Sequence, residues 1–411
     1  MTRAAAIRSQ TFASLVNPNF RRYISGQGVS VVGTWMQIIA QGWLVLQLTG
    51  SGTAIGIVVA LQTLPMLLLG PYGGVIADRV DKRRLMIALQ SVMGVQALAL
   101  GVLTLTGSVQ LWHVYVLAVL LGLNQCFENP ARQAFLMEVV GPGHVRNAVS
   151  LQSVLNSMAR AVGPAVAGII ISYGGLGLCF LLNAASFVAV VLSLVTLNLA
   201  ALMPTEPAVR ARGQLRAGLA YVRRTPELAI PLAMMALMGC FTYEFQVVLP
   251  VVADKVFGAG ASGYGFMTAA MGVGAVVGGL WIATWGRTGA RSLVVIALAF
   301  GAAIALTALA QSLWVAVAAL VVVGMLSVGF TATANSTLQL AAAPDMRGRV
   351  MALWAVAFLG STAIGGPVAG WVSEEFGGRA GLALAAVTCI VAAGLGVAGM
   401  MRGRTAVLAV S

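Results

Sequence analysis

The chain has little charge. Only 9% of its 411 residues are Asp, Glu, Lys or Arg, and the acidic residues number 11. Ordinary soluble domains carry about 25% charged residues. With 59% hydrophobic residues, a soluble fold would expose large apolar patches and aggregate. The composition therefore excludes a soluble globular protein and predicts one whose solvent is a lipid bilayer.

The chain also has few residues that bind metals or form disulfides. It contains two histidines and four cysteines, and the cysteines are scattered singly, with no paired spacing. This pattern argues against a disulfide framework and against a metal site. No Gly-x-x-x-x-Gly-Lys-Ser/Thr loop is present, so ATP is not the expected energy source. We expect no cofactor, no metal and no enzyme activity.

Long runs without a charged residue predict transmembrane hairpins. One run lies between Arg22 and Asp78, and another lies between Arg84 and Glu128. Each is longer than the roughly 20 residues of one membrane helix and fits two helices joined by a turn. Gly- and Ser-containing turns divide these runs, because both residues interrupt helices. The sequence therefore predicts an all-α membrane protein of twelve helices, at 23–47, 53–77, 85–105, 111–132, 147–171, 177–199, 229–252, 262–284, 292–310, 313–335, 350–373 and 380–400.

Basic residues set the predicted orientation. The net charge of +13 does not indicate nucleic acid as a partner, because basic residues gather on the cytoplasmic loops of membrane proteins. In the twelve-helix arrangement, all but three of the 24 basic residues lie on one side, the exceptions being Lys255, Arg379 and Arg160. Both termini are therefore predicted to be cytoplasmic. Arg21 and Arg22 precede an apolar run too long for a cleaved signal peptide.

The chain divides into two predicted halves. A loop over 200–228 separates a six-helix half at 1–199 from a second at 229–411, and its part from Gln214 to Arg224 is predicted to form a basic amphipathic helix. Arg146 stands 18 residues before Pro164 and Arg349 stands 18 residues before Pro367, at an offset of 203. This match favours a duplicated six-helix unit, with a substrate site between the halves.

One loop carries the resemblance to a known family. After the second predicted helix comes Gly73-Gly74-Val-Ile-Ala-Asp78-Arg79-Val-Asp81-Lys82-Arg83-Arg84. It resembles the loop signature of the major facilitator superfamily, Gly-x-x-Ala-Asp-Arg-x-Gly-Arg-Lys, and departs from it at Asp81, where the family usually has Gly. The resemblance implies two pseudo-symmetric six-helix halves and secondary transport by alternating access.

Shorter motifs point to one branch of that superfamily. Asn129-Pro130-Ala-Arg132-Gln133, Arg146-Asn147 and the amino-terminal Asn17-Pro18-Asn19-Phe20 resemble the branch that includes enterobactin exporters and macrolide-efflux proteins. Gly163-Pro164, followed by Gly168, resembles the antiporter-associated motif of the superfamily and favours export over import. Gly366-Pro367 is its counterpart in the second half. The alternative is ordinary helix packing through small residues.

The loop signature is interpreted as a cytoplasmic latch that closes one side of the transporter. Asp78 is expected to accept hydrogen bonds at the N-terminus of the eleventh helix, where a negative charge is stabilised. Lys82 or Arg83 is expected to pair with an acid on the fourth helix, for which Glu128 is the first candidate. The alternative is that the basic residues only set the orientation. The predicted latch comprises Gly74, Asp78, Arg79, Lys82, Arg83, Glu128 and Arg132.

Polar groups at membrane depth are the candidates for proton and substrate binding, because ionisable residues there are rare and costly. Glu244, beside Tyr243 in the seventh helix, is the first candidate for a proton-carrying carboxylate. The repeat offset relates Glu244 to Gln41 in the first helix, which also carries Gln37. The alternative for Glu244 is a structural hydrogen bond to a neighbouring helix.

The fifth helix presents a polar face. Gln152, Asn156 and Arg160 follow one another at steps of four residues and so share one side of the helix. Arg160 is expected to meet an anionic group of a substrate or a carboxylate. These three residues complete the predicted proton and substrate site.

The function predicted from the sequence is secondary active transport. We expect proton-driven export of a small amphipathic compound, such as a drug, a macrolide or a siderophore, from the bacterial cytoplasm across the inner membrane. The partners expected are the lipid bilayer, protons and the substrate, and the protein is expected to be a monomer. An importer of the same fold is the first alternative, and a membrane sensor without transport is the second.

Overall fold

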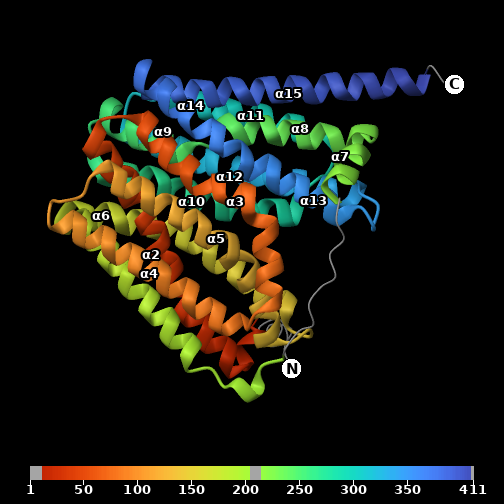
Figure 1. Cartoon of the computed structure of the whole chain (residues 1–411). Coiled ribbons are helices and arrows are strands. Elements are labelled where there is room, and N and C mark those ends of the chain that lie inside the picture. Colours follow the sequence, from red (N-terminus) through yellow and green to blue (C-terminus); the bar gives the residue numbers. More distant parts are fainter. Residues whose placement is uncertain (1–11, 204–213, 409–411) are drawn as a thin grey trace, which may run out of the picture. The chain divides into compact units, whose positions relative to one another are not determined.

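The computed structural model describes residues 12–203 and 214–408, with the side chains of all of these except 71–78, 214–218, 285 and 402–408. Every regular element in these ranges is a helix, and the described part of the chain contains no strand (Figure 1). The predicted all-α fold class is therefore confirmed. The short elements are η1 (Ala13–Val16), η2 (Leu199–Ala201) and α7 (Gln214–Arg224), and α7 agrees with the helix predicted in the loop.

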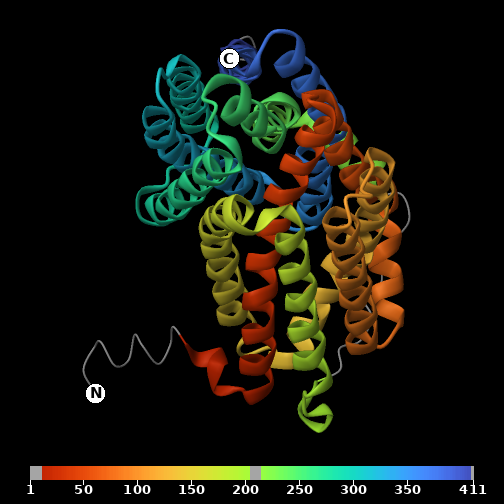
Figure 2. The ribbon, with the colours of Figure 1, turned by 90° about the vertical axis from the view of Figure 1, so that its left-hand side faces the viewer.

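The described helices have the length and composition for twelve membrane crossings. Eleven helical spans in the described residues are long and apolar enough to cross a membrane, but one of them, α6 (Val145–Val195), has 51 residues. It is broken at Gly175, where φ is 78° and ψ is 171°, so its two limbs count as separate crossings (Figure 2). The other long elements are α2 (Pro18–Thr49), α3 (Gly52–Arg79), α4 (Lys82–Leu105), α5 (Leu111–Val140), α8 (Pro226–Phe241) with α9 (Phe245–Val251) and η3 (Val252–Val256), α10 (Gly260–Trp285), α11 (Ala290–Leu309), α12 (Leu313–Ala341), α13 (Arg347–Ala355) with η4 (Val356–Gly360) and α14 (Ser361–Glu375), and α15 (Gly378–Leu408).

Side-chain caps explain where several helices begin. The side-chain oxygen of Asn17 accepts hydrogen bonds from the backbone N–H groups of Asn19 and Phe20 at the start of α2, at 2.9 and 3.3 Å. Asp81 accepts from the N–H of Arg84 at 2.8 Å at the start of α4. Asp is among the best residues for this position. The departure from the family signature at Asp81 therefore has a local reason, because the residue caps the helix that follows.

Two predicted continuous helices are interrupted. The helix predicted over 229–252 breaks at Thr242–Glu244, between α8 and α9, and continues as the π-helix η3. Pro250 has no N–H, so the carbonyl of Gln246 loses its helical partner, and the hydroxyl of Tyr264 donates to it at 3.5 Å. The helix predicted over 350–373 contains the π-helix η4. Single π turns inside α-helices are frequently found at functional sites.

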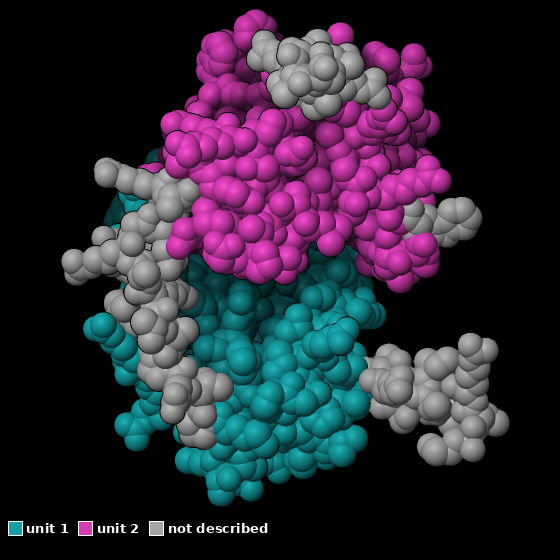
Figure 3. Space-filling view, turned by 90° about the vertical axis from the view of Figure 1, so that its right-hand side faces the viewer, with its two compact units in different colours: residues 1–41, 68–209 teal, residues 42–67, 210–411 magenta. Residues whose placement is uncertain are grey.

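The helices form two compact units, coloured separately in Figure 3. Unit 1 contains residues 1–41 and 68–209, and unit 2 contains residues 42–67 and 210–411. Both α2 and α3 are thus divided, and the segment 42–67 that joins them belongs to unit 2. The predicted halves at 1–199 and 229–411 rest on the sequence repeat and not on contacts between helices. The division into two units does not test them, and they stay a prediction.

Both units combine a core of large side chains with close glycine contacts. Unit 1 has a cluster of aromatic and aliphatic side chains that includes Phe20, Tyr23 and Phe135, all fully buried. Unit 2 has glycine contacts of backbone against backbone. A methyl group on Gly274 of α10 would overlap the backbone of Val321 in α12, and one on Gly365 of α14 would overlap the carbonyl of Cys240 in α8. Small residues of this kind allow close backbone contact inside a membrane.

We predict that Gly365→Ala destabilises the protein. The added methyl group has no room beside the Cys240 carbonyl, and overpacking a tight contact costs about 1–3 kcal/mol. The measurement is the midpoint of thermal unfolding of purified protein in detergent. Gly394→Ala is the matched control, because a Cβ on this α15 glycine would meet nothing within 4 Å. Equal midpoints for the two variants would contradict the close packing of α8 on α14.

Candidate functional site

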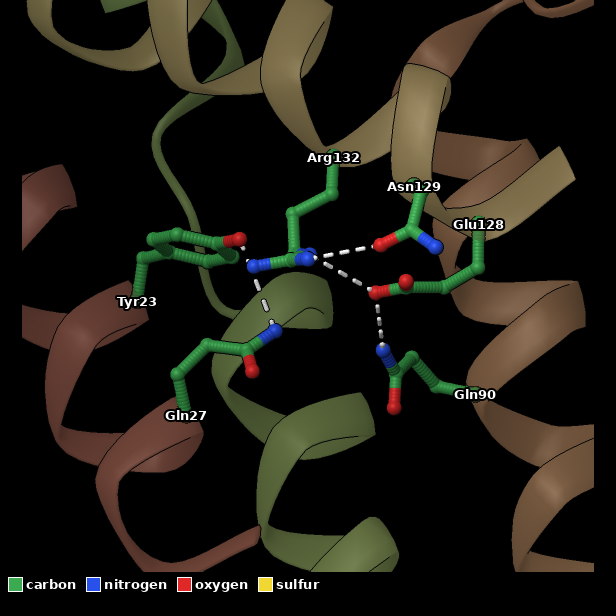
Figure 4. Close-up of polar contacts among 6 residues, drawn as sticks. All are labelled: Tyr23, Gln27, Gln90, Glu128, Asn129 and Arg132. Atoms are coloured by element: carbon green, nitrogen blue, oxygen red, sulfur yellow. Dashed lines mark hydrogen bonds and ion pairs between the residues drawn. The ribbon is translucent and has the colours of Figure 1, made fainter. Parts of the chain in front are cut away.

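A buried ion pair lies inside unit 1. Arg132 Nε is 3.1 Å from Glu128 Oε1, one helical turn earlier on α5. The guanidinium also donates to Asn129 Oδ1 at 2.8 Å, and Gln90 Nε2 of α4 lies 3.4 Å from the same Glu128 oxygen (Figure 4). Because a buried charge must be paired and hydrogen-bonded to be tolerated, these four side chains stabilise one another.

Tyr23 of α2 extends this polar cluster. Its side chain is fully buried and packs edge-on against Phe135 at a centroid distance of 5.8 Å. Gln27 Nε2 lies 3.5 Å from the tyrosine hydroxyl (Figure 4), and Gln152 of α6 is also hydrogen-bonded to it. Gln152, predicted as part of a substrate face, therefore joins a cluster built by α2, α4, α5 and α6.

Several amide groups near this cluster have no hydrogen-bond partner among the described residues. They are the side-chain oxygens of Gln90 and Asn124 and both polar ends of Gln96. All three residues are buried. Buried polar groups nearly always bond to protein or to ordered water. The interior of unit 1 is thus polar enough to hold water or the polar groups of a small molecule.

Asn156 and Arg160 share one face of α6 and meet Trp35 of α2. Trp35 Nε1 lies 3.4 Å from Asn156 Oδ1, and the Arg160 guanidinium carbon lies 5.0 Å from the centre of the Trp35 ring. Both Asn156 and Arg160 are exposed. A cation over an indole in this way is stabilised by the ring quadrupole, so Trp35 holds an accessible positive charge in place.

The two candidate glutamines of α2 differ in their surroundings. Gln37 Oε1 accepts a hydrogen bond of 2.6 Å from Asn183 Nδ2 on the second limb of α6. Gln41 is buried, with 6% of its surface exposed. The structure therefore gives Gln37 a packing role within unit 1 and does not bring the two glutamines into the cluster around Glu128.

The predicted latch residues make different pairs from those expected. Lys82 Nζ forms a buried ion pair of 2.8 Å with Glu138 at the end of α5. Arg83 donates to the carbonyls of Leu194 and Val195 at 2.8 and 2.9 Å. Lys82 thus pairs with an acid on α5, as expected for the fourth helix, but the choice of Glu128 as that acid is wrong, because Glu128 pairs with Arg132 on its own helix.

The remaining latch residues contribute less to the described structure. Arg79 is exposed at the end of α3. Gly74 and Asp78 lie in the segment 71–78, outside the residues whose side chains are described. Their predicted contact with the eleventh helix stays a prediction.

Glu244 is the buried carboxyl of unit 2. It lies at the break before α9 and is 3% exposed. Its Oε1 has no hydrogen-bond partner among the described residues, while Thr362 of α14 is hydrogen-bonded to the carboxyl group. Its Oε2 faces Gly366, 3.5 Å from the position that a Cβ would occupy there. No described ion pair involves this carboxyl.

Tyr243 fixes the break in which Glu244 lies. Its hydroxyl donates to the carbonyl of Ser327 in α12 at 3.0 Å. Its ring packs edge-on against Phe300 of α11 and Phe358 of η4, at 5.8 and 5.5 Å. The hydroxyl of Thr242 donates to the Ala385 carbonyl at 3.2 Å. These contacts of Tyr243 and Thr242 with neighbouring helices stabilise the break.

The glycine–proline motifs lie at tight helix crossings. In unit 1, a methyl group on Gly163 would be 2.6 Å from the Cβ of Trp35, so α6 packs closely on α2, and Pro164 and Gly168 are buried beside it. In unit 2, Gly366 precedes Pro367 on α14, and a Cβ there would be 3.0 Å from the carbonyl oxygen of Gly56 in α3. Both motifs therefore allow close approach as well as bending.

One polar group in unit 2 escaped the sequence analysis. Glu374, at the end of α14, accepts hydrogen bonds from Ser51 and Thr53 at the start of α3. The available signal was a Ser-x-Thr sequence at a predicted helix start, which is typical of capping. Nothing in the sequence indicated that the partner would come from a residue more than 300 positions away.

The described residues contain no group of three or more His, Cys, Asp and Glu side chains that could hold a metal ion. The polar groups brought together are instead carboxyls, amides and guanidinium groups. Such a set can bind a polar or anionic solute and can take up or release protons.

We predict that Arg132→Gln lowers stability much more than Arg84→Gln. Removing Arg132 leaves the Glu128 carboxylate buried without a cation, which costs about 3–5 kcal/mol. Arg84 also pairs with an acid on its own helix end, Asp81, but the two side chains are 85% and 58% exposed, and such pairs contribute about 0–1 kcal/mol. Thermal unfolding in detergent compares the two variants. Similar midpoints would show that the Glu128–Arg132 pair is not buried as described.

Comparison with known proteins assigns the family. The family described as transmembrane secretion effector matches residues 9–407. The chain is 23% identical to the enterobactin exporter of Escherichia coli O1:K1 over 356 residues, which cover 86% of this chain and 85% of that protein. It is 28% identical to the staphyloferrin A transporter of Staphylococcus aureus over 257 residues, covering 62% of this chain and 64% of the relative.

Another relative matches over a shorter stretch. An MFS-type transporter of Bacillus subtilis is 31% identical over 168 residues, which cover 40% of this chain and 38% of that protein. In two of these three relatives, the matched part is thus less than two thirds of their own length. Of these three, the match with the enterobactin exporter covers the largest share of both chains.

Solved structures show the same fold. The nucleoside transporter NupG superposes with a TM-score of 0.71 at 13% identity, covering 91% of this chain and 98% of that one. A bacterial homologue of the iron transporter ferroportin, in an inward-facing state, superposes with a TM-score of 0.71 at 14% identity, covering 93% and 98%. The family match over nearly the whole sequence and this shared fold lead to one conclusion: the chain belongs to the transmembrane secretion effector family, whose members are membrane transporters of the major facilitator superfamily.

Proposed function

We propose that this protein exports a small amphipathic compound of the siderophore class across the bacterial inner membrane, in exchange for protons that enter through Glu244. The observation that carries the proposal is the position of this carboxyl. It is buried in unit 2, has no described ion-pair partner, and keeps one oxygen without a hydrogen bond.

A carboxyl in this position suits proton transport. Ionisable residues at membrane depth are expensive and usually functional. A structural Glu would be expected to have several donors, as Glu374 has Ser51 and Thr53 and as Glu128 has Arg132 and Gln90. Glu244 instead holds one hydrogen bond, to Thr362, and the break at Thr242–Glu244 places it at a helix end. A proton can be gained or lost there without separating an ion pair.

The proposed substrate class rests on the relatives and on the polar face of α6. One relative is an enterobactin exporter and another is a staphyloferrin A transporter. Arg160, held over Trp35 and exposed, supplies a cation for an anionic group, and the indole supplies an apolar surface beside it. A molecule with both acidic and aromatic or apolar parts is the complementary ligand.

An ion gradient is sufficient as the energy source. Moving one elementary charge through 100 mV yields about 2.3 kcal/mol. Because about 1.4 kcal/mol corresponds to a tenfold ratio, one proton per cycle supports a substrate gradient of roughly fifty-fold. Alternating access of a central site would couple the two movements.

We further propose that both termini face the cytoplasm and that the protein works as a monomer. The orientation is supported by the one-sided distribution of the basic residues in the sequence. It places the turn between α2 and α3, at Gly50–Ser51, on the outer face of the membrane.

We predict that Glu244→Gln abolishes substrate-dependent proton flux. The amide keeps the size and hydrogen-bonding capacity of the side chain but cannot carry a proton. The measurement is the decay of an imposed pH gradient in proteoliposomes, with catechol siderophores and lipophilic drugs as the added compounds. Wild type is expected to dissipate the gradient when a substrate is present, at a rate at least tenfold above that of the variant.

The matched control is Glu227→Gln, the same substitution at an exposed carboxyl in the first turn of α8. It is expected to retain wild-type flux. Equal flux in wild type and Glu244→Gln would remove Glu244 as the proton carrier. If substrate and protons cross the membrane in the same direction, the protein is an importer and the proposed export is wrong.

A further inference from the structure

Glu374 makes the most extensive carboxylate contacts in unit 2. Its Oε2 accepts hydrogen bonds from Ser51 Oγ at 2.5 Å, from Thr53 Oγ1 at 2.6 Å and from the backbone N–H of Thr53 at 3.1 Å. The first N–H groups of a helix have no partner within the helix, and a negative charge there is stabilised by the helix dipole. Glu374, from the end of α14, therefore caps the start of α3.

The two helices approach each other closely next to this cap. Added methyl groups on Gly52 and Gly56 of α3 would overlap the carbonyls of Gly370 and Gly366, and a methyl group on Gly370 would overlap the carbonyl of Gly52. We call this contact, formed by Gly52, Gly56, Gly366 and Gly370, the glycine seam. It leaves no space between the two backbones, so its closure excludes a passage for solutes between them.

A second contact between a charged side chain and a helix end lies beside this cap, in the turn between α2 and α3. Lys255 Nζ of η3 donates to the carbonyl of Gly50, at the end of α2, at 2.9 Å. The α2–α3 turn is thus held from two elements of unit 2, with a carboxylate on the start of α3 and an ammonium group on the end of α2. A negative charge at a helix start and a positive charge at a helix end are both stabilised by the helix dipole.

The other end of the seam reaches the proposed proton site. Gly366 lies beside the Oε2 of Glu244, and Glu374 follows it by eight residues, a rise of about 12 Å along α14. The same helix therefore contacts the buried carboxyl at one point and carries the capping carboxyl at another.

We infer that Glu374 is a positioning residue for transport, which holds α14 against the start of α3 and keeps the glycine seam closed at the Ser51 end. The inference deepens the proposed function, on which it rests, because alternating access requires a pathway that opens at this end. Opening separates Glu374 from its three donors at once. Removing the Glu374 carboxylate is therefore expected to favour the open arrangement. Removing the neighbouring carboxylate of Glu375, which makes none of these bonds, is not.

The test measures the separation of the α2–α3 turn from the end of α14, without substrate and without a proton gradient. Spin labels on cysteines at Gln47 and Phe376, two exposed positions at the Ser51 end, report their separation by pulsed electron resonance in nanodiscs. The four native cysteines are replaced by alanine in the background, whose transport is checked first. We expect Glu374→Ala to shift the distance distribution to longer values, with at least a tenfold rise in the ratio of open to closed populations.

Graded variants separate positioning from a loss of stability. Glu374→Gln keeps an acceptor for the same donors and is expected to restore most of the closed population. Glu375→Ala removes the exposed neighbouring carboxylate and is expected to leave the distances unchanged. In a Ser51→Ala, Thr53→Val background, adding Glu374→Ala is expected to have little further effect, because the shared contacts are already gone.

Three results would overturn the inference: unchanged distances in Glu374→Ala, an equal shift in Glu375→Ala, or full additivity in the combined variant. A drop in thermal stability with no change in the distances would assign Glu374 a structural role only. These outcomes are independent of the flux measurement. Failure of proton coupling would remove the function proposed for Glu244 and leave the distances to decide the role of Glu374.

Discussion

The absence of water from the bilayer interior is the constraint on which the rest of the structure depends. Every backbone group and every charge at that depth must find its partner within the protein. Arg132 meets Glu128 in this way, and nearer the helix ends Lys82 meets Glu138 and Arg83 donates to the last carbonyl groups of α6. Of the described acids, Asp81 and Glu374 cap helices, and Glu128 and Glu138 form ion pairs. Glu244 stands apart because its carboxyl lacks both an ion pair and a full set of hydrogen bonds.

The same absence of water removes the hydrophobic force between helices, since lipid tails are as apolar as leucine. Close packing between small residues takes its place. In unit 2, α14 packs closely on two neighbours through its glycines. Gly365 lies against α8, and Gly366 and Gly370 lie against α3. These contacts join the backbone of α14 to those of its neighbours, and the hydrogen bonds of Glu374 hold the end of the helix that contacts α3.

The crossings could be predicted from the sequence because they depend on composition alone. Runs without charge and glycine-rich turns located twelve crossings, including the break at Gly175. The interruption at Thr242–Glu244 could not, since neither glycine nor proline lies at the break itself. It is set by Tyr243 and Thr242, which bond to carbonyls on α12 and α15. The sequence showed two possible partners for Glu128, Arg132 on the same helix and Lys82 on α4. Only the structure shows that Lys82 lies beside Glu138 and leaves Glu128 to Arg132. Glu374 could not be assigned at all without knowing that α14 ends beside the start of α3.

On the proposed function, α14 explains how a proton could act on the pathway at the Ser51 end. Thr362 and Gly366 lie against Glu244, and Glu374 is the last acid before the helix ends. A change in the charge of Glu244 alters what its carboxyl requires from Thr362, and the Gly56 carbonyl, on the same side of Gly366 as Glu244 Oε2, leaves little room for α14 to move there. Any shift of α14 there must be taken up along the helix, toward the three hydrogen bonds of Glu374. The π segment η4, directly before α14, supplies a turn that can absorb the displacement without breaking the helix. Coupling then needs no long relay, because the helix that contacts the buried carboxyl is also the helix that closes the seam.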